Sequence, residues 1–177
     1  HCIVGRSSGA RVSGIVEGEP VGVTSHRVEA NGRMTLPQFL RPLLGFSFAI
    51  MPLPSPCLVL MPQDAFLDAV GEWREKRSLF DPDASVLERF FVGNADVVAL
   101  DRQGRVVISP ELRQLTKLHG DVKILAMRDR VEVWDAVAYE EEMKDLSPER
   151  IQAALNRKFG FQGPPVAAPE GHAEAGG

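Results

Sequence analysis

The residues best suited to chemistry are two arginines that close the same five-residue pattern. Glu29-Ala30-Asn31-Gly32-Arg33 recurs 72 positions later as Asp101-Arg102-Gln103-Gly104-Arg105. An acidic side chain at the start of a turn accepts backbone N–H bonds, and glycine supplies a positive φ at no steric cost. The pattern therefore predicts two tight turns, with Glu29, Gly32, Asp101 and Gly104 as turn formers. It leaves two roles open for each arginine: a local ion pair that braces the hairpin, or a guanidinium presented to a ligand.

The repetition extends beyond the turns. A second arginine, Arg41 or Arg113, keeps the offset of 72, and Leu58-Val59-Leu60-Met61 matches Val131-Glu132-Val133-Trp134 at an offset of 73. A period this long, present twice, indicates a duplicated module, because a solenoid needs at least three shorter units.

Each module is predicted to run strand, turn, strand, short helix and second hairpin. Short apolar, β-branched runs bounded by Gly and Pro are typical of such strands. The predicted strands are 21–28, 33–36, 47–51 and 57–61 in the first module, and 95–100, 105–108, 122–127 and 131–134 in the second.

A pair of helices is predicted after each module. In the first pair, the first helix spans 63–79 and carries apolar Phe66, Leu67, Val70 and Trp73 at helical spacing. The second helix is capped by Asp83 and ends at Phe91. The second pair spans 135–144 and 148–159, with Ser147 as N-cap before Pro148. Trp73 and Trp134 fall on apolar faces and are predicted to lie in the core.

Four regions follow from this organisation. Residues 1–20 lack the basic-then-apolar order of a secretory signal and are interpreted as a flexible leader. Residues 21–94 and 95–160 hold the two modules with their helices. Residues 161–177 are rich in Gly, Pro and Ala, which predicts a disordered tail.

The overall charge of -4 and pI near 5.6 argue at first against nucleic acid, whose binders usually carry a basic surface. The charge is unevenly distributed, however: residues 22–61 sum to +2 and 95–134 to +1, whereas the helical segments 62–94 and 135–177 sum to -3 and -4. Apolar runs are far too short to cross a membrane, and two cysteines without metal-ligand spacing indicate a reducing, cytosolic compartment.

An enzyme would have to use His26 with Asp96, Asp101 or Glu29 as acid-base partners. The sequence has no Gly-rich phosphate loop before a helix, no nucleophile elbow and no His/Cys cluster with ligand spacing. We therefore expect no enzymatic activity, no cofactor, no metal site and no small-molecule ligand.

The motifs together resemble those of the MraZ family. The first copy reads Gly22-x-x-x-His26-x-Val28-Glu29-x-x-Gly32-Arg33-x-x-Leu36-Pro37-x-x-x-Arg41. The second reads Asp101-x-x-Gly104-Arg105-x-x-Ile108, then Pro110-Glu111-Leu112-Arg113, and ends in the strand-to-helix step Val133-Trp134-Asp135. The resemblance runs from about Gly22 to Phe159.

The resemblance implies an α+β fold in which two tandem SpoVT-AbrB-like swapped-hairpin modules interleave into one pseudo-symmetric barrel. It also implies a nucleoid-associated, ring-shaped homo-oligomer that binds double-stranded DNA at G-rich direct repeats and represses its own division and cell-wall gene cluster. By the same resemblance, Arg33 and Arg105 are the arginines of the DNA-facing turns. A guanidinium bidentate to guanine N7 and O6 is the commonest specific base contact, so a G-rich site is consistent with them.

The chain departs from the family pattern in its first copy, where Glu29 replaces the usual Asp and Asn31 the usual Lys. The longer acid weakens the expected turn brace. Asn31 remains a candidate DNA-binding residue, although it lacks the cation for a phosphate contact. Arg102 and Gln103 offer a charge and an amide to phosphate or base, and Arg27 is a candidate phosphate contact or a solvated side chain. The alternative function is an antitoxin-like or assembly module of the same fold that binds a protein partner.

Overall fold

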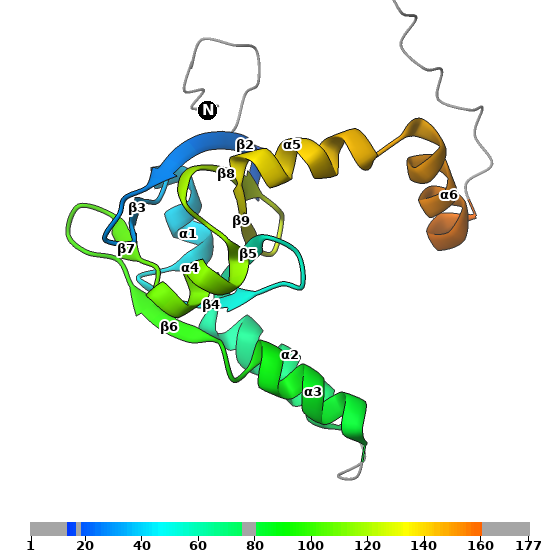
Figure 1. Cartoon of the computed structure of the whole chain (residues 1–177), viewed down its shortest axis with the longest axis horizontal. Helices are drawn as coiled ribbons and strands as arrows, with labels where there is room; N and C mark the ends of the chain where they lie inside the picture. The colour runs from blue at the N-terminus through cyan, green and yellow to red at the C-terminus, as the bar shows by residue number, and fades with distance from the viewer. Residues whose placement is uncertain (1–13, 17–18, 76–80, 161–177) are drawn as a thin grey trace, which may run out of the picture. The chain divides into compact units, whose positions relative to one another are not determined.

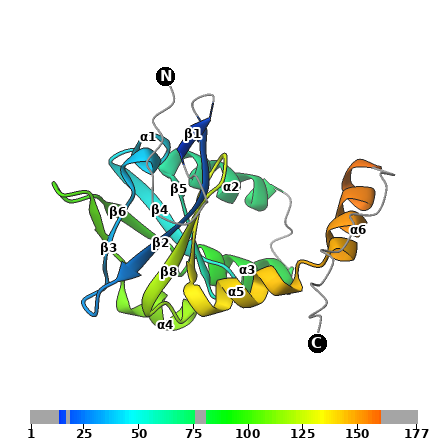
Figure 2. The same cartoon turned by 90° about the horizontal axis from the view of Figure 1, so that it is seen from above.

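The computed structural model describes residues 14–16, 19–75 and 81–160 (Figures 1 and 2). Two compact units divide after Ala138: the first contains the strands and the helices up to α4, and the second begins at Tyr139 within α5. Most of the predicted leader (1–13, 17–18) and all of the predicted tail (161–177) lie outside the described residues.

All eight predicted strands are confirmed, with ends that differ by at most two residues. They are β2 (Glu19–Val28), β3 (Arg33–Thr35), β4 (Ser47–Pro52), β5 (Cys57–Pro62), β6 (Asp96–Ala99), β7 (Arg105–Val107), β8 (Gly120–Ala126) and β9 (Val131–Asp135). One further strand, β1 (Gly14–Val16), pairs with β2 and falls within the residues interpreted as a leader.

The strands of the two repeats interleave in one antiparallel barrel. Their order is β6-β4-β5-β9-β8-β2-β3-β7, and contacts between β6 and β7 bring the two ends of this path together. The hairpin β4–β5 of the first repeat is thus flanked by β6 and β9 of the second. The predicted α+β fold, with hairpins of both repeats interleaved into a nearly closed barrel, is confirmed.

The pairing register confirms that the barrel is pseudo-symmetric. Met34 lies opposite Val106 where β3 meets β7, and Val59 lies opposite Glu132 where β5 meets β9. Each of these pairs joins a residue to its own repeat equivalent, at the offsets of 72 and 73 found in the sequence. A residue can face its own equivalent only beside a two-fold axis, so an approximate axis passes through both pairs.

The core is built from matching side chains of the two halves. Short helices α1 (Arg41–Leu44), which follows a 3₁₀ turn at Gln38–Leu40, and α4 (Pro110–Thr116) contribute leucines from both repeats. Burial of one such side chain contributes about 1.5–3 kcal/mol. The matched core pairs are Val28 and Leu100, Met34 and Val106, Leu36 and Ile108, and Leu40 and Leu112.

Two details of the first helical pair differ from the predictions. α3 (Pro82–Phe91) is capped by Asp81, whose carboxylate accepts N–H bonds from Asp83 and Ala84 at 3.0 and 3.3 Å. The prediction that Asp83 is the cap was wrong, because Pro82 fits the first helical position and moves the cap one residue before it.

The prediction that Trp73 lies in the core was also wrong. On α2 (Gln63–Glu75), Trp73 is 38% exposed and its ring packs 5.2 Å from that of Phe91 on α3. Val70 on the same helix is buried. Helical spacing identified the apolar face of α2 correctly, but not how much of that face another element covers.

The second unit consists of most of α5 (Ala136–Asp145) together with α6 (Pro148–Phe159). The hydroxyl of Ser147 caps α6 by accepting the N–H of Arg150 at 3.2 Å, and Pro148 takes the first helical position. Both features were predicted. Arg150 also pairs with Asp145 within this unit.

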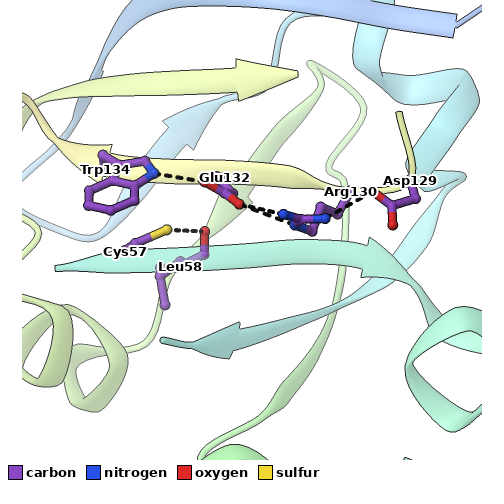
Figure 3. A network of polar contacts seen from close by, with 6 residues as sticks. All are labelled: Cys57, Leu58, Asp129, Arg130, Glu132 and Trp134. Atoms are coloured by element: carbon purple, nitrogen blue, oxygen red, sulfur yellow. Dashed lines mark hydrogen bonds and ion pairs between the residues drawn. The ribbon is translucent and has the colours of Figure 1, made fainter. Parts of the chain in front are cut away.

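A buried acidic group lies on the outer face of the barrel wall (Figure 3). Because Leu58 and Val133 point into the core, alternation turns Cys57, Glu132 and Trp134 outward. Glu132 is only 8% exposed and accepts hydrogen bonds from Trp134 Nε1 and Arg130 Nε, both at 3.1 Å. Trp134 is buried as predicted, and burial also raises the pKa of the Cys57 thiol.

Candidate nucleic-acid interface

The two predicted turns have the same backbone hydrogen bonds. In each, the acidic residue donates its N–H to the carbonyl of the arginine and accepts the N–H of the glycine. These bonds are Glu29 to Arg33 and Gly32 to Glu29, both 2.8 Å, and Asp101 to Arg105 and Gly104 to Asp101, both 2.9 Å. Gly32 and Gly104 have φ of 84° and 77°, the left-handed region that favours glycine. The two turns therefore share one backbone conformation, formed by the main chain of Glu29 and Asp101 and by the two glycines.

In the second turn, the acidic side chain braces the arginine. Asp101 Oδ1 accepts the N–H groups of Gln103 and Arg105 at 2.8 and 2.9 Å, and Oδ2 accepts Arg105 Nε at 2.8 Å. The bonds from Arg105, backbone first and side chain second, hold the pKa of Asp101 below its ordinary value. The ion-pair role left open by the sequence is thus present here, and it orients a guanidinium whose Nη atoms have no hydrogen-bond partner among the residues that the structure describes.

The first turn uses a different acceptor. Asn31 Oδ1 accepts the N–H of Arg33 at 3.0 Å, which is the bond that Asp101 makes in the other half. Within the described residues, neither the Glu29 carboxylate nor the Arg33 guanidinium has a side-chain partner. Arg33 is therefore exposed and unbraced, in keeping with the weaker brace expected from the longer acid.

Both arginines lie on one outward face of the wall formed by β3 and β7. In this antiparallel pair, Arg33 is opposite Val107 and Thr35 is opposite Arg105. Met34 and Val106 between them point into the core, so these four side chains point outward. Arg33 and Arg105 are diagonal neighbours across the pair, which puts their Cα atoms roughly 7–8 Å apart.

The remaining candidates occupy the edges of this face. Arg102 and Gln103 are exposed at the tip of the second turn. Arg27 lies on β2, where it pairs with Asp121 on β8 at 3.0 Å, and both side chains are more than two-thirds exposed. An exposed pair of this kind contributes about 0–1 kcal/mol, so Arg27 can exchange its carboxylate for another anion at little cost.

Sequence reasoning assigned no role to Arg41 and Arg113, although it noted their constant spacing. The structure brings both guanidinium groups against the turns: Arg113 Nη1 donates to the carbonyl of Ala30 at 3.2 Å, and the Arg41 guanidinium lies against Gly104. The signal that could have found them was the repeat itself, because both arginines recur at the same offset as the turns.

The residues weighed for enzyme chemistry do not assemble. His26 Nε2 shares a hydrogen bond with Thr24 Oγ1 at 3.1 Å, and burial lowers the pKa of the imidazole. Across residues 14–16, 19–75 and 81–160, no three His, Cys, Asp or Glu side chains gather in a metal-ligating cluster. In the same part of the chain, no helix combines the length and hydropathy of a membrane span.

Comparisons with known proteins agree with the geometry. Residues 91–162 match the family model described as "MraZ protein, putative antitoxin-like". A transcriptional regulator MraZ of Ralstonia pickettii is 33% identical over 144 residues, which cover 79% of this chain and 98% of that protein. The regulator MraZ of Verminephrobacter eiseniae is 35% identical over 123 residues, covering 67% and 84%. The chain therefore belongs to the MraZ family of transcriptional regulators.

Proposed function

We propose that this protein is a cytoplasmic, nucleoid-associated repressor that binds G-rich direct repeats upstream of its own division and cell-wall gene cluster. Arg33 and Arg105 contact guanine edges in the major groove, Arg102 and Gln103 contact the backbone or a flanking base, and Arg27 contacts phosphate. Asn31 shapes the first turn. The observation that carries the proposal is the common outward face of Arg33 and Arg105, one from each half of the barrel.

The spacing of the two arginines supports base contacts. Their Cα atoms are roughly 7–8 Å apart, and two successive base steps of DNA, at roughly 3.4 Å each, cover nearly the same distance. The major groove admits two β-strands side by side, and a guanidinium binds guanine N7 and O6 with two hydrogen bonds. One subunit can therefore reach two nearby guanines with Arg33 and Arg105, while Thr35 and Val107 fill the surface between them.

The charge distribution is compatible with this interface. The residues of α2 and α3 and those after β9 carry the negative balance, whereas both repeats are mildly basic. A single subunit has few cations, so we propose that a homo-oligomeric ring repeats the same face along the DNA and gains affinity through multivalency. Exposed apolar side chains on α2 and α3 support self-association: Leu67, Val86 and Leu87 are 65%, 58% and 52% exposed.

The test is binding of the purified protein to the DNA upstream of its own gene, measured by fluorescence anisotropy over a salt series. A scrambled duplex serves as the DNA control, and Arg157→Ala, an exposed arginine at the end of α6, as the protein control. We expect the wild type and Arg157→Ala to prefer the upstream DNA with a steep salt dependence. Arg33→Ala and Arg105→Ala should each lose about 1–3 kcal/mol of that preference while remaining folded.

Two results would count against the proposal. If the wild type shows no preference for the upstream DNA at low salt, sequence-specific repression is wrong. If a protein partner co-purifies with the chain and Arg33→Ala leaves DNA affinity unchanged, the antitoxin-like alternative named by the family description becomes the better account.

A further inference from the structure

The arginine of α4 reaches across the barrel to the first turn. Arg113 Nη1 donates to the Ala30 carbonyl at 3.2 Å. A Cβ placed on Gly32 would lie 3.1 Å from Arg113 Nε and 3.3 Å from Cζ, so the guanidinium lies directly against this glycine. A residue of the second half thus contacts the turn that carries Arg33.

Arg41 makes the reciprocal contact from the first half. Its guanidinium occupies the space where a Cβ on Gly104 would stand. Its Nη2 donates to the Leu36 carbonyl at 3.4 Å, and the N–H of Leu36 donates to the Gly104 carbonyl at 3.0 Å. Arg41 therefore touches the second turn directly and also binds the strand end that holds it.

Backbone hydrogen bonds cross between the halves in the same reciprocal way. Ile108 donates its N–H to Gly32 at 2.9 Å, just as Leu36 donates to Gly104. In both arginines, Nε is buried and has no hydrogen-bond partner among the described residues. The planar guanidinium thus packs against a glycine and gives up one of its hydrogen bonds to do so, an arrangement that the compact ammonium of lysine cannot reproduce.

We infer that Arg113 and Arg41 are positioning residues that each fix the turn of the opposite half, so that each half shapes the DNA contact of the other. This inference rests on the proposed function for its effect on DNA binding. Arg113 acts through the first turn and hence through Arg33, and Arg41 acts through the second turn and hence through Arg105. Neither needs to touch DNA.

The first test uses the free protein and is independent of DNA. Amide hydrogen exchange by NMR is compared between the wild type and Arg113→Met, which keeps a long side chain but lacks the guanidinium. We expect faster exchange at Gly32 and Arg33 and unchanged exchange at Gly104 and Arg105. Arg41→Met should show the opposite pattern, and Arg157→Met should change neither turn. Unchanged exchange at both turns, or equal acceleration at both, would overturn the inference.

The second test is a double-mutant cycle on binding to the upstream DNA. We expect Arg113→Met to weaken binding about five- to tenfold in the wild type and in Arg105→Ala, and less than about twofold in Arg33→Ala, since coupled residues are non-additive. Equal weakening in both backgrounds would refute positioning through the first turn. Absence of specific binding by the wild type would instead refute the proposed function. The hydrogen-exchange measurement would then still decide whether Arg113 and Arg41 fix the two turns.

A lysine variant separates positioning from direct contact. If Arg113 bound phosphate itself, Arg113→Lys would bind DNA like the wild type, and Arg113→Met would lower the salt slope by about one. Positioning predicts that Arg113→Lys is weakened nearly as much as Arg113→Met, with an unchanged salt slope. If Arg113→Met fails to fold, Arg41→Met tests the same inference from the other half. It should then weaken DNA binding in the wild type and in Arg33→Ala, but much less in Arg105→Ala.

Discussion

Replacement of Gly32 by alanine should destabilise the barrel more than replacement of another positive-φ glycine. Gly32 has φ of 84°, where a side chain costs about 1–2 kcal/mol. Its new Cβ would also lie 2.5 Å from the Ile108 carbonyl oxygen, so the two backbones must separate. The separation weakens the Ile108 to Gly32 hydrogen bond, which contributes about 0.5–1.5 kcal/mol. The two costs sum to about 1.5–3.5 kcal/mol.

Gly120 provides a matched control within the same barrel. Its φ is 72°, and the nearest atom to an added Cβ is Arg27 Nη2 at 4.0 Å, an ordinary contact. Gly120→Ala therefore isolates the backbone cost of about 1–2 kcal/mol. The expected difference between the two variants is about 1 kcal/mol.

Urea unfolding followed by circular dichroism measures both values, provided that the m-value stays constant. Gly32→Ala should also lose preference for the upstream DNA, because the turn that carries Arg33 shifts, whereas Gly120→Ala should retain it. Equal stability losses in the two variants would refute the argument that the first turn is closed tightly against Ile108.

Three further predictions concern single side chains. Arg105 stabilises the ionised form of Asp101, so the contribution of this carboxylate to stability is present above its ordinary pKa of 3.8 and is lost as pH falls through its lower folded pKa. The urea midpoints of the wild type and Asp101→Asn should therefore differ at pH 7 and converge in acid. A difference that widened in acid would contradict this role of Arg105. In a Cys2→Ser variant, the Cys57 thiol, buried and with a raised pKa, should react with a disulfide reagent only after unfolding, and rapid labelling of Cys57 in the folded variant would show that this strand is accessible. Glu132→Val should lower the free energy of unfolding by about 1–3 kcal/mol, because Trp134 Nε1 loses its hydrogen-bond acceptor, and Glu132→Gln should lower it less. Equal stability of Glu132→Val and the wild type in urea would argue against this hydrogen bond.

Much of the fold followed from local sequence signals. Short apolar, β-branched runs bounded by glycine and proline located all eight strands, because β-branched side chains favour extended backbone and the flanking glycines and prolines interrupt it. The duplication then implied matching halves, and the pairs Met34 with Val106 and Val59 with Glu132 agree with it. The acidic side chain accepts the arginine N–H in the second turn, as the pattern predicts, whereas in the first turn Asn31 accepts it in place of Glu29.

Contacts across the barrel were beyond local reasoning. The sequence does not reveal that Arg113 packs on Gly32, since the two residues meet only after the strands interleave. The same limit applies to Trp73, whose exposure depends on what lies over α2. Buried Glu132 is another case, because its partners Arg130 and Trp134 became recognisable only once β9 showed them on one face.

The interleaved strand order also has a consequence for how the chain folds as it is made. β2 pairs along its length with β8, so that Gly22 lies opposite Ala126. At a synthesis rate of roughly 5–20 residues per second, β2 leaves the ribosome roughly 5–20 s before its partner exists. Non-local pairing of this kind slows folding and leaves strand edges open. During that interval the open edge of β2 can capture β8 of another chain, so slow synthesis should favour strand-exchanged dimers of this protein.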